Sequence, residues 1–438
     1  MMIMVLTLCA CGAESSSGES SSADSAKDSA SESSKESSSA SDSAADSSSA
    51  NSSESSSSGN KKKNPTAEAV VTKYASAYDL ETISAKEFTE AMALGWNIGN
   101  TLDATGGDGT DPIKQETSWG CPEITQDLIN AVAGYGFTTI RIPVTWAKFT
   151  DPTTYKIDEK MLARVKQVVD WAIEADLFVI INVHHEDYDA AENTGWLSVT
   201  DENYEKTSAQ LTEMWRQIGT YFADYGPQLI FEGMNEPRNK GAGGEWVGTQ
   251  GQWDNVNKLG LDFVSTIRAL GGNNAKRFLM VPCYAATSNS SAWASYKFPE
   301  NDDRVIMSIH AYLPYNFALN TGGTDQWTSA SKSDTQDIDN LFSQIKSILI
   351  DNGHYAVIGE YGAMGKNANI AAREDWAKYY AAKAREVGVP IVWWDNNAFA
   401  DGETFGLIRR NMKNSLLFTG IVENLINSWY KTDFHFDS

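Results

Sequence analysis

The chain reads LIFEGMNEP at residues 229–237 and AVIGEYG at residues 356–362. In both segments an apolar run, long enough for a β-strand, ends at a glutamate: Glu236 in the first and Glu360 in the second. Because these glutamates are far apart in sequence, they meet only if the fold brings the two strand ends together. A closed barrel of parallel strands does this, since the carboxyl ends of all its strands lie on one face.

Strand and helix patterns alternate on both sides of these two segments. Runs rich in Val and Ile predict eight strands, at residues 93–99, 138–144, 178–185, 229–235, 277–283, 305–312, 356–360 and 391–396. Apolar residues at helical spacing predict helices at 124–133, 161–174, 204–222, 256–270, 338–349, 373–387 and 416–429. This alternation indicates an α/β fold, a (β/α)8 TIM barrel over residues 67–438. The segment exceeds the roughly 250 residues of a minimal barrel, so we expect long loops that build a groove.

The first 66 residues show no pattern of a folded domain. Residues 1–12 are mainly apolar and end in LCACG, which resembles the lipid-attachment box of a bacterial lipoprotein signal with Cys11 as the acylated residue. A partial ordinary signal peptide and a start without an export role remain alternatives. Residues 13–66 are a low-complexity Ser/Asp/Glu linker, which we expect to be a disordered tether. Together these segments predict an extracellular protein anchored at the cell surface through Cys11, or otherwise secreted.

The composition narrows the classes of partner. The net charge of −23 disfavours binding to nucleic acid and to anionic membrane surfaces, because the only basic run is KKK at residues 61–63. A neutral polymer is an easier partner, and 14 Trp, 17 Tyr and 16 Phe supply aromatic surface to bind it. We therefore expect a monomer that binds a polysaccharide and contacts the membrane only through a lipid anchor.

Seven motifs fall in order at the ends of the predicted strands. They read GWNIGNTLDA at 95–104, RIPV at 141–144, NVHHE at 182–186, NEP at 235–237, HAY at 310–312, GEY at 359–361 and WWDNN at 393–397. Together they resemble glycoside hydrolase family 5, most closely its bacterial endoglucanases of the cellulase A type. The resemblance implies cleavage of internal bonds in β-glucans, with Glu236 as the acid/base and Glu360 as the nucleophile.

The chemistry of such a pair sets what each carboxyl needs. In a retaining glycosidase one carboxylic acid protonates the leaving oxygen, while a carboxylate about 5–5.5 Å away attacks the anomeric carbon. Burial and the nearby charge of Glu360 would keep Glu236 protonated near neutral pH. Glu360 must stay ionised, which calls for a cation and a hydroxyl donor, and Arg141 and Tyr312 offer these groups.

Further strand-end residues are expected to bind sugar. Asn235 could hold the hydroxyl next to the reacting carbon, and Asn97 could contact sugars along the groove or simply cap a turn. Trp394 is implied by the resemblance to stack on a sugar, whereas Trp393 has the opposite parity and should pack under the helices. The expected substrate-binding residues are Asn97, Arg141, His184, His185, Asn235, His310, Tyr312 and Trp394.

Adjacent histidines raise the question of a metal. Successive strand residues point to opposite faces, so His184 and His185 should not grip one ion together. No second His follows four positions on, as a zinc protease requires. By resemblance His184 binds the sugar beside the cleaved bond, while His185 lies near it or serves only in packing. We predict no metal and no cofactor.

Three functions remain open from the sequence. The first is an endo-β-1,4-glucanase; the second is a relative that prefers xyloglucan, mixed-linkage glucan or mannan. The third is a surface lipoprotein that binds oligosaccharides without cleaving them, but such a protein needs no pair of carboxyls. Cys121 and Cys283 could form a disulfide or remain free thiols.

Overall fold

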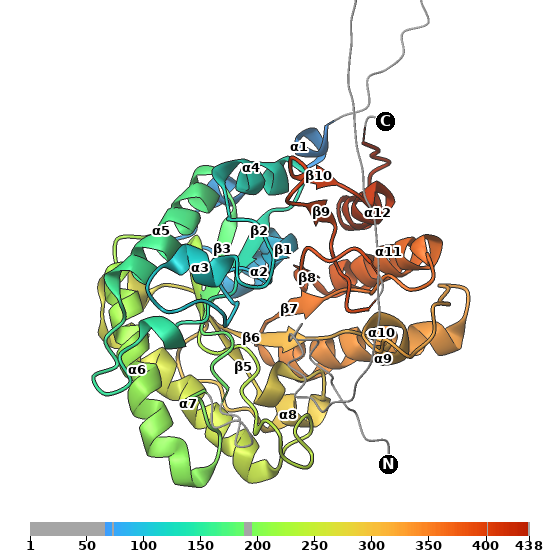
Figure 1. Ribbon diagram of the computed structural model, residues 1–438. Coiled ribbons are helices and arrows are strands. Elements are labelled where there is room, and N and C mark those ends of the chain that lie inside the picture. Colours follow the sequence, from blue (N-terminus) through green and yellow to red (C-terminus); the bar gives the residue numbers. More distant parts are fainter. Residues whose placement is uncertain (1–65, 72–73, 188–194, 401, 437–438) are drawn as a thin grey trace, which may run out of the picture. The chain divides into compact units, whose positions relative to one another are not determined.

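A closed barrel of eight parallel strands forms the centre of the fold (Figure 1). The computed structural model describes residues 66–71, 74–187, 195–400 and 402–436. The predicted signal segment with Cys11, and the linker up to residue 65, lie outside the described residues. The barrel strands are β1 (Leu94–Ile98), β2 (Thr139–Ile142), β3 (Phe178–Asn182), β4 (Leu229–Glu232), β5 (Leu279–Pro282), β6 (Val305–His310), β7 (Ala356–Tyr361) and β8 (Ile391–Asp395).

Each strand pairs with the next, and β8 returns to β1. The closing register runs from Leu94 opposite Ile391 to Ile98 opposite Asp395, and this pairing is parallel like the others. The predicted (β/α)8 TIM barrel is therefore confirmed. Two strands end earlier than their apolar runs suggest. Strand β3 stops at Asn182, and β4 stops at Glu232.

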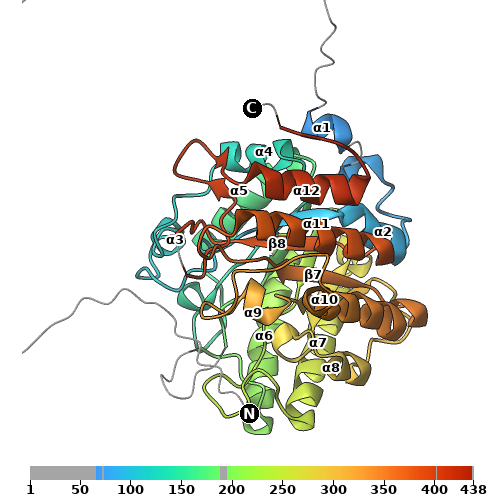
Figure 2. The same cartoon turned by 90° about the vertical axis from the view of Figure 1, so that its right-hand side faces the viewer.

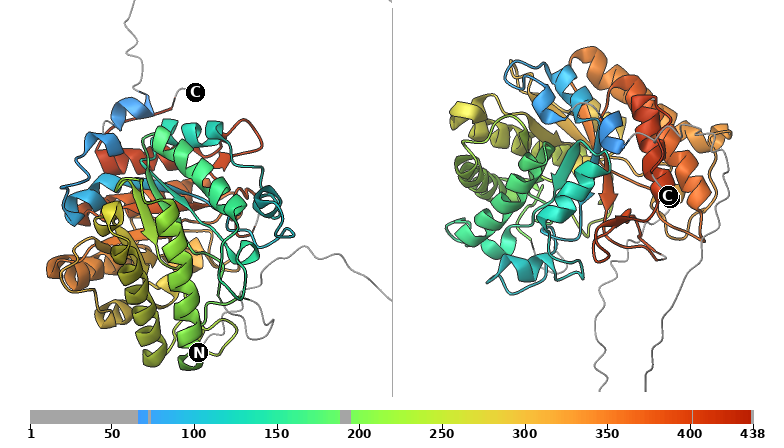
Figure 3. Two further views of the ribbon diagram at one scale, coloured as in Figure 1. Left: turned by 90° about the vertical axis from the view of Figure 1, so that its left-hand side faces the viewer. Right: turned by 90° about the horizontal axis from the view of Figure 1, so that it is seen from above.

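Helices follow one another around the strands (Figure 3). The longer ones are α4 (Gln126–Gly134), α5 (Glu159–Glu174), α6 (Tyr204–Tyr221), α7 (Gln250–Ala269), α10 (Lys332–Gln344), α11 (Ile370–Val387) and α12 (Thr419–Tyr430). The shorter ones are α1 (Ala67–Val70), α2 (Ala85–Met92), α3 (Pro112–Glu116), α8 (Ser290–Ser295) and α9 (Tyr315–Ala318). A small hairpin joins β9 (Ile408–Arg409) to β10 (Ser415–Leu416). Figure 2 shows α10, α11 and α12 one beside another.

Short polar sequences set where several helices begin. At the start of α2 the Ser84 hydroxyl accepts from the Glu87 backbone N–H, and the Glu87 carboxylate accepts from the Ser84 backbone in return. Thr249 and Gln252 make the same reciprocal contact at the start of α7. These capping boxes satisfy backbone donors that a helix leaves unpaired at its first turn. Among the described residues, no helix is both long and apolar enough to cross a membrane.

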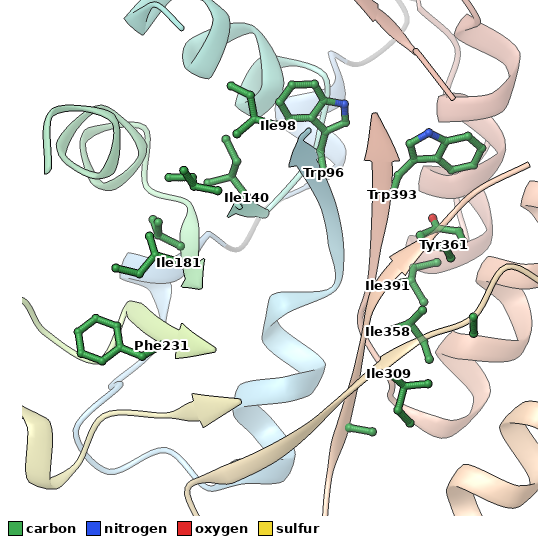
Figure 4. Packing of buried hydrophobic residues seen from close by; sticks show 14 of the residues in the cluster. Trp96, Ile98, Ile140, Ile181, Phe231, Ile309, Ile358, Tyr361, Ile391 and Trp393 are labelled. Atoms are coloured by element: carbon green, nitrogen blue, oxygen red, sulfur yellow. The ribbon is translucent and has the colours of Figure 1, made fainter. Parts of the chain in front are cut away.

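The apolar core has two parts. One part fills the space between the strands and the surrounding helices, where Figure 4 shows Trp96, Phe231 and Trp393 among its members. The other lies inside the amino end of the barrel, where Phe88 of α2 stacks on Phe278 with ring centroids 3.6 Å apart. Helix α2 thus closes that end with apolar side chains, and polar groups gather at the opposite end.

Candidate active site

Glu236 and Glu360 come together at the carboxyl ends of the strands. Glu360 lies on β7, and Glu236 lies four residues beyond the last residue of β4. One carboxyl oxygen of each, together with a ring nitrogen of His310, forms a group whose atoms all lie within 4.8 Å of one another. The two side chains are 19% and 8% exposed, respectively, so both are reachable but largely shielded from water.

A register irregularity in β7 directs Glu360 into the site. Strict alternation would turn Glu360 away, because Val357 already points into the barrel. The pairing of β7 with β8 shifts between Ile358 and Tyr361, and such a bulge re-aims the side chains next to it. A Cβ on Gly359 would come within 2.9 Å of the Ser308 hydroxyl, so a larger residue would have to displace that hydroxyl.

Glu360 is held by two donors. Nη1 of Arg141 donates to Oε1 at 2.8 Å, and the Tyr312 hydroxyl donates to Oε2 at 3.0 Å. These are the cation and the hydroxyl that the sequence suggested. Burial raises the pKa of the Glu360 carboxyl, and the charges of His310 and Arg141 oppose this without cancelling it. Glu360 therefore ionises at a higher pH than an ordinary glutamate, although its contacts suit the charged form.

Glu236 shares a proton with a histidine. Nδ1 of His310 lies 2.8 Å from Oε1 of Glu236, and Nη1 of Arg238 lies 3.6 Å from Oε2. Burial alone would raise the pKa of Glu236, but the His310 hydrogen bond and the charges of His310 and Arg238 outweigh it and lower the pKa. Burial opposes protonation of His310, yet the carboxylates of Glu360 and Glu236 raise its pKa.

In the free protein the lowered pKa of Glu236 and the raised pKa of His310 favour this shared proton on His310. The expectation that burial keeps Glu236 protonated is wrong, because the sequence did not reveal that His310 donates to this carboxylate. The proton nevertheless lies within one hydrogen bond of Glu236, so a shift along that bond produces the acid without a proton from solvent.

Arg141 contacts a third carboxylate that the sequence-based reasoning missed. Nε of Arg141 donates to Glu232 at 2.6 Å, and both side chains are fully buried. The side-chain oxygen of Asn97 accepts from Arg141 at 2.9 Å. The side-chain NH₂ of Asn97 donates to the backbone carbonyls of Gly359 and Val392. Asn97 is fully buried, so the expectation that it binds sugar is wrong; it supports the arginine instead. Alternation could have revealed Glu232, because it shares parity with the inward Ile230.

Asn235 also reaches Arg141. Nη2 of Arg141 donates to the Asn235 side-chain oxygen at 2.7 Å. This contact leaves the amide NH₂ as the end of Asn235 that faces away from the arginine. Asn235 and Glu236 both lie beyond β4, so strand alternation does not apply to them.

His184 is neutral and its tautomer is defined. The Asn182 side-chain oxygen accepts from the Val144 N–H at 3.0 Å, so the Asn182 amide nitrogen faces Nδ1 of His184, also at 3.0 Å. Nδ1 is therefore an acceptor and Nε2 carries the hydrogen. Burial lowers the pKa of His184 well below its usual value, and the charges of His185 and Arg141 add to this effect. Trp394 lies parallel to the His184 ring, with centroids 5.9 Å apart.

His185 lies on the same side as His184. The two rings are only 4.4 Å apart, so the alternation argument that separated them is wrong; β3 has already ended at Asn182. With Asp103 they form a group whose ligand atoms lie within 4.8 Å of one another, as do the atoms of the glutamate pair and His310. Nothing in these contacts tests the prediction that no metal is bound.

Other predicted features lie outside the site. Trp393 is fully buried and packs against Tyr361, with ring centroids 5.4 Å apart, as its parity predicted. Cys121 and Cys283 are both free and buried. A hollow of about 700 Å³ lies away from the glutamates, between the segment that contains Trp293 and the one that contains His354.

A family profile described as Cellulase (glycosyl hydrolase family 5) matches residues 102–400, which include both glutamates. The chain belongs to glycosyl hydrolase family 5. Membership of family 5 makes it a glycoside hydrolase, and it confirms the family suggested by the seven motifs.

Similar proteins in family 5 cover most of the chain. Endoglucanase B of Neocallimastix patriciarum is 43% identical over 359 residues, which are 80% of this chain and 73% of that relative. A solved GH5-4 broad specificity endoglucanase from Ruminococcus champanellensis, with bound cellotriose, is 38% identical with a TM-score of 0.74, over 80% of this chain and 100% of that one. A mutant lichenase from Caldicellulosiruptor sp. F32, in complex with cellotetraose, is 35% identical with a TM-score of 0.74. The match covers 79% of this chain and 96% of that one.

Proposed function

We propose that this protein is a retaining endo-β-1,4-glucanase, with Glu236 as acid/base and Glu360 as nucleophile. The separation of at most 4.8 Å between their carboxyl oxygens carries the proposal. Retaining glycosidases place the two carboxyl groups about 5–5.5 Å apart, whereas inverting ones leave about 6.5–9.5 Å for a water molecule. The bound between one oxygen of each carboxyl lies below the inverting range and therefore supports retention.

In the first step Glu360 attacks the anomeric carbon. An oxygen of Glu360 forms the new C–O bond as the glycosidic bond breaks, and the leaving oxygen takes a proton from Glu236. That proton comes from the hydrogen bond between His310 Nδ1 and Glu236, so His310 ends this step neutral. The products are a glycosyl ester on Glu360, an ionised Glu236 and a shortened polymer.

In the second step water replaces Glu360. Glu236, now ionised, takes a proton from a water molecule on the face that the leaving group vacated, and this water attacks the anomeric carbon. The ester bond breaks and Glu360 recovers its negative charge beside Arg141 and Tyr312. Two displacements on opposite faces give net retention of the anomeric configuration.

Three groups are suited to hold the sugar during these steps. The Nε2–H of His184 and the amide NH₂ of Asn235 can donate to sugar hydroxyls. The indole of Trp394 offers an apolar face to the CH groups of a pyranose ring. A Cβ on Gly99 would come within 2.7 Å of that indole, so the glycine leaves space for the Trp394 ring.

The proposal extends to the preferred polymer. The similar structures include proteins described as broad specificity endoglucanases and one described as a lichenase. We therefore propose activity on cellulose derivatives and on mixed-linkage glucan, with xyloglucan and mannan as the alternatives. A reducing-sugar assay across these four substrates ranks them, and a rapid fall in viscosity identifies attack within chains.

The stereochemistry tests the mechanism directly. Proton NMR of a fresh digest should show the β-anomer first, before mutarotation produces the α-anomer. First release of the α-anomer would exclude Glu360 as a nucleophile. A protein that binds cello-oligosaccharides and cleaves none of the four polymers would instead support the third hypothesis, a binding lipoprotein.

We also propose that the protein is anchored outside the cell through Cys11 and acts as a monomer. The LCACG sequence supports the anchor, and a net charge of −23 disfavours self-association through uniform repulsion. Labelling with a radioactive fatty acid should mark the native protein and not a Cys11→Ala variant. Light scattering of the protein without residues 1–65 should give the mass of one chain.

A further inference from the structure

Arg141 is shared between two buried carboxylates. Its Nη1 donates to Glu360 at 2.8 Å, and its Nε donates to Glu232 at 2.6 Å. The other oxygen of Glu232 accepts from the Ser308 hydroxyl at 2.5 Å. Arg141, Glu232 and Ser308 are all fully buried, so water provides no alternative partner for this group.

The guanidinium is planar, so a contact on one edge fixes the direction of the others. Glu232 engages Nε, on the edge next to the side-chain stem. Once that edge is fixed, Nη1 must face Glu360 and Nη2 must face Asn235, as the distances of 2.8 Å and 2.7 Å show. Glu232 therefore orients a residue that contacts the nucleophile, although no contact joins it to Glu360 directly.

The proposed reaction changes the charge on only one of the two carboxylates. When Glu360 becomes a glycosyl ester it loses its negative charge, and the Arg141 cation loses an ionic partner. A buried cation without a partner is strongly destabilised. Glu232 takes no part in bond making, so it keeps its charge and remains paired with Arg141 throughout.

We propose that Glu232 is a positioning residue, which orients Arg141 and serves as its counterion while Glu360 is esterified. The inference rests on the retaining mechanism proposed above. It predicts that loss of the Glu232 charge slows formation of the ester, because Arg141 would then have only Glu360 as an ionic partner and would oppose the attack.

The same sharing should govern the pH at which Glu360 ionises. Among the described residues, four charged or titratable groups face Glu360. They are Arg141 from β2, His310 at the end of β6, Tyr312 two residues beyond it, and Glu236 beyond β4. Removing the other carboxylate from Arg141 leaves its charge wholly available to Glu360. The acid limb of the rate profile, which reports ionisation of Glu360, should then move to lower pH.

The test is the Glu232→Gln variant, with Glu116→Gln as its matched control. The amide fits the site, because the Ser308 hydroxyl can accept as well as donate. Glu116 is also fully buried and paired with an arginine, Arg164, through two contacts of 2.9 Å, but it lies outside the active site. We expect kcat of E232Q on a soluble β-glucan to fall roughly 10²-fold with KM little changed, and the acid limb to move to lower pH.

The control separates catalysis from folding. E116Q removes the same charge from a buried pair, so it should lower Tm while its kcat and acid limb stay as in the wild type. If E232Q does not fold, Glu232→Asp is used; it keeps the charge and should keep the wild-type acid limb at a reduced kcat. A displaced limb in E232D, or a wild-type kcat and limb in E232Q, would overturn the proposal.

The wild-type protein provides the separate test of the proposed function. If it cleaves no β-glucan, or releases the inverted anomer first, the retaining mechanism fails before any variant is compared. A retaining wild type with an unaffected E232Q variant would overturn the role of Glu232 alone.

Discussion

One carboxyl oxygen of Glu236 lies within 4.8 Å of one of Glu360, yet the surroundings of the two carboxyls differ in kind. Glu360 faces Arg141 and Tyr312, which donate hydrogen bonds and keep their protons near neutral pH. Glu236 faces His310, a side chain that can gain or lose a proton near neutral pH. The contrast matches two chemical tasks, because a nucleophile needs one stable charge state and an acid/base must change its own.

The largest effect is expected for Glu360→Ala. Without a nucleophile no glycosyl ester forms, so hydrolysis of β-glucan should fall on the order of 10⁵-fold. Azide, which fits the vacated space, should restore turnover and give the α-glycosyl azide, because it attacks from the face that Glu360 occupied. Rate assays and NMR of the product check both expectations. A variant that keeps the full rate would remove Glu360 from the mechanism.

Much of this arrangement follows from periodicity in the sequence. Eight strand patterns predicted the closed barrel. Closure of the barrel brings Glu236 and Glu360 to one face. The predicted strands ran too far at β3 and β4, because Val183 and Met234, just beyond their ends, are apolar although the backbone has left the ladder. Strand alternation was applied beyond those ends, so it misplaced His185.

Other features depend on distances that a sequence does not encode simply. The bulge that re-aims Glu360 is one register step between neighbouring strands. The proton shared by His310 and Glu236 depends on a single contact of 2.8 Å. Strand alternation could have predicted that Glu232 points into the barrel. It could not have predicted that Arg141 is the partner of this carboxylate.

A smaller and more selective loss is expected for Glu236→Ala. General acid catalysis contributes about 10²–10⁴-fold, so the rate on β-glucan should fall by roughly 10³. A dinitrophenyl β-cellobioside needs no protonation of its leaving group, so its first step should be spared. Stopped-flow traces should show a burst of dinitrophenol in this variant and none in Glu360→Ala. A burst absent from both would contradict the assignment of Glu236 as the acid.

The pH profile should be bell-shaped. Activity requires an ionised Glu360, whose pKa is raised by burial, so the rate increases as the pH rises through a range above that of an ordinary glutamate. It also requires one proton on the pair formed by Glu236 and His310. The pKa of His310 is raised from 6.5, so the rate decreases as the pH rises through a value above 6.5. Profiles of kcat/KM measure both limbs in the free enzyme.

The His310→Gln variant tests which group sets the alkaline limb. Glutamine can still donate a hydrogen bond to Glu236, but it does not ionise and cannot give up a proton in this pH range. The proton must then reside on Glu236, a weaker base than histidine, so the alkaline limb should move to lower pH and the rate should fall roughly 10²-fold. The acid limb reports Glu360 and serves as the internal reference. An alkaline limb unchanged from the wild type would show that His310 is not the proton store.

The smallest effect is expected for Tyr312→Phe. The informative result is the direction in which the acid limb of the pH profile moves. A hydrogen bond to a charged group contributes about 1.5–3 kcal/mol, and the lower end of this range corresponds to about tenfold. Losing the contact of 3.0 Å should therefore slow the reaction by at least about tenfold. The phenol favours ionised Glu360, so its removal raises the pKa of Glu360 and moves the acid limb to higher pH, opposite to the shift expected for E232Q. Tyr361→Phe is the matched control, because among the described residues that buried hydroxyl has no hydrogen-bond partner. If both Tyr312→Phe and E232Q moved the limb the same way, Glu360 would not be the group that the acid limb reports.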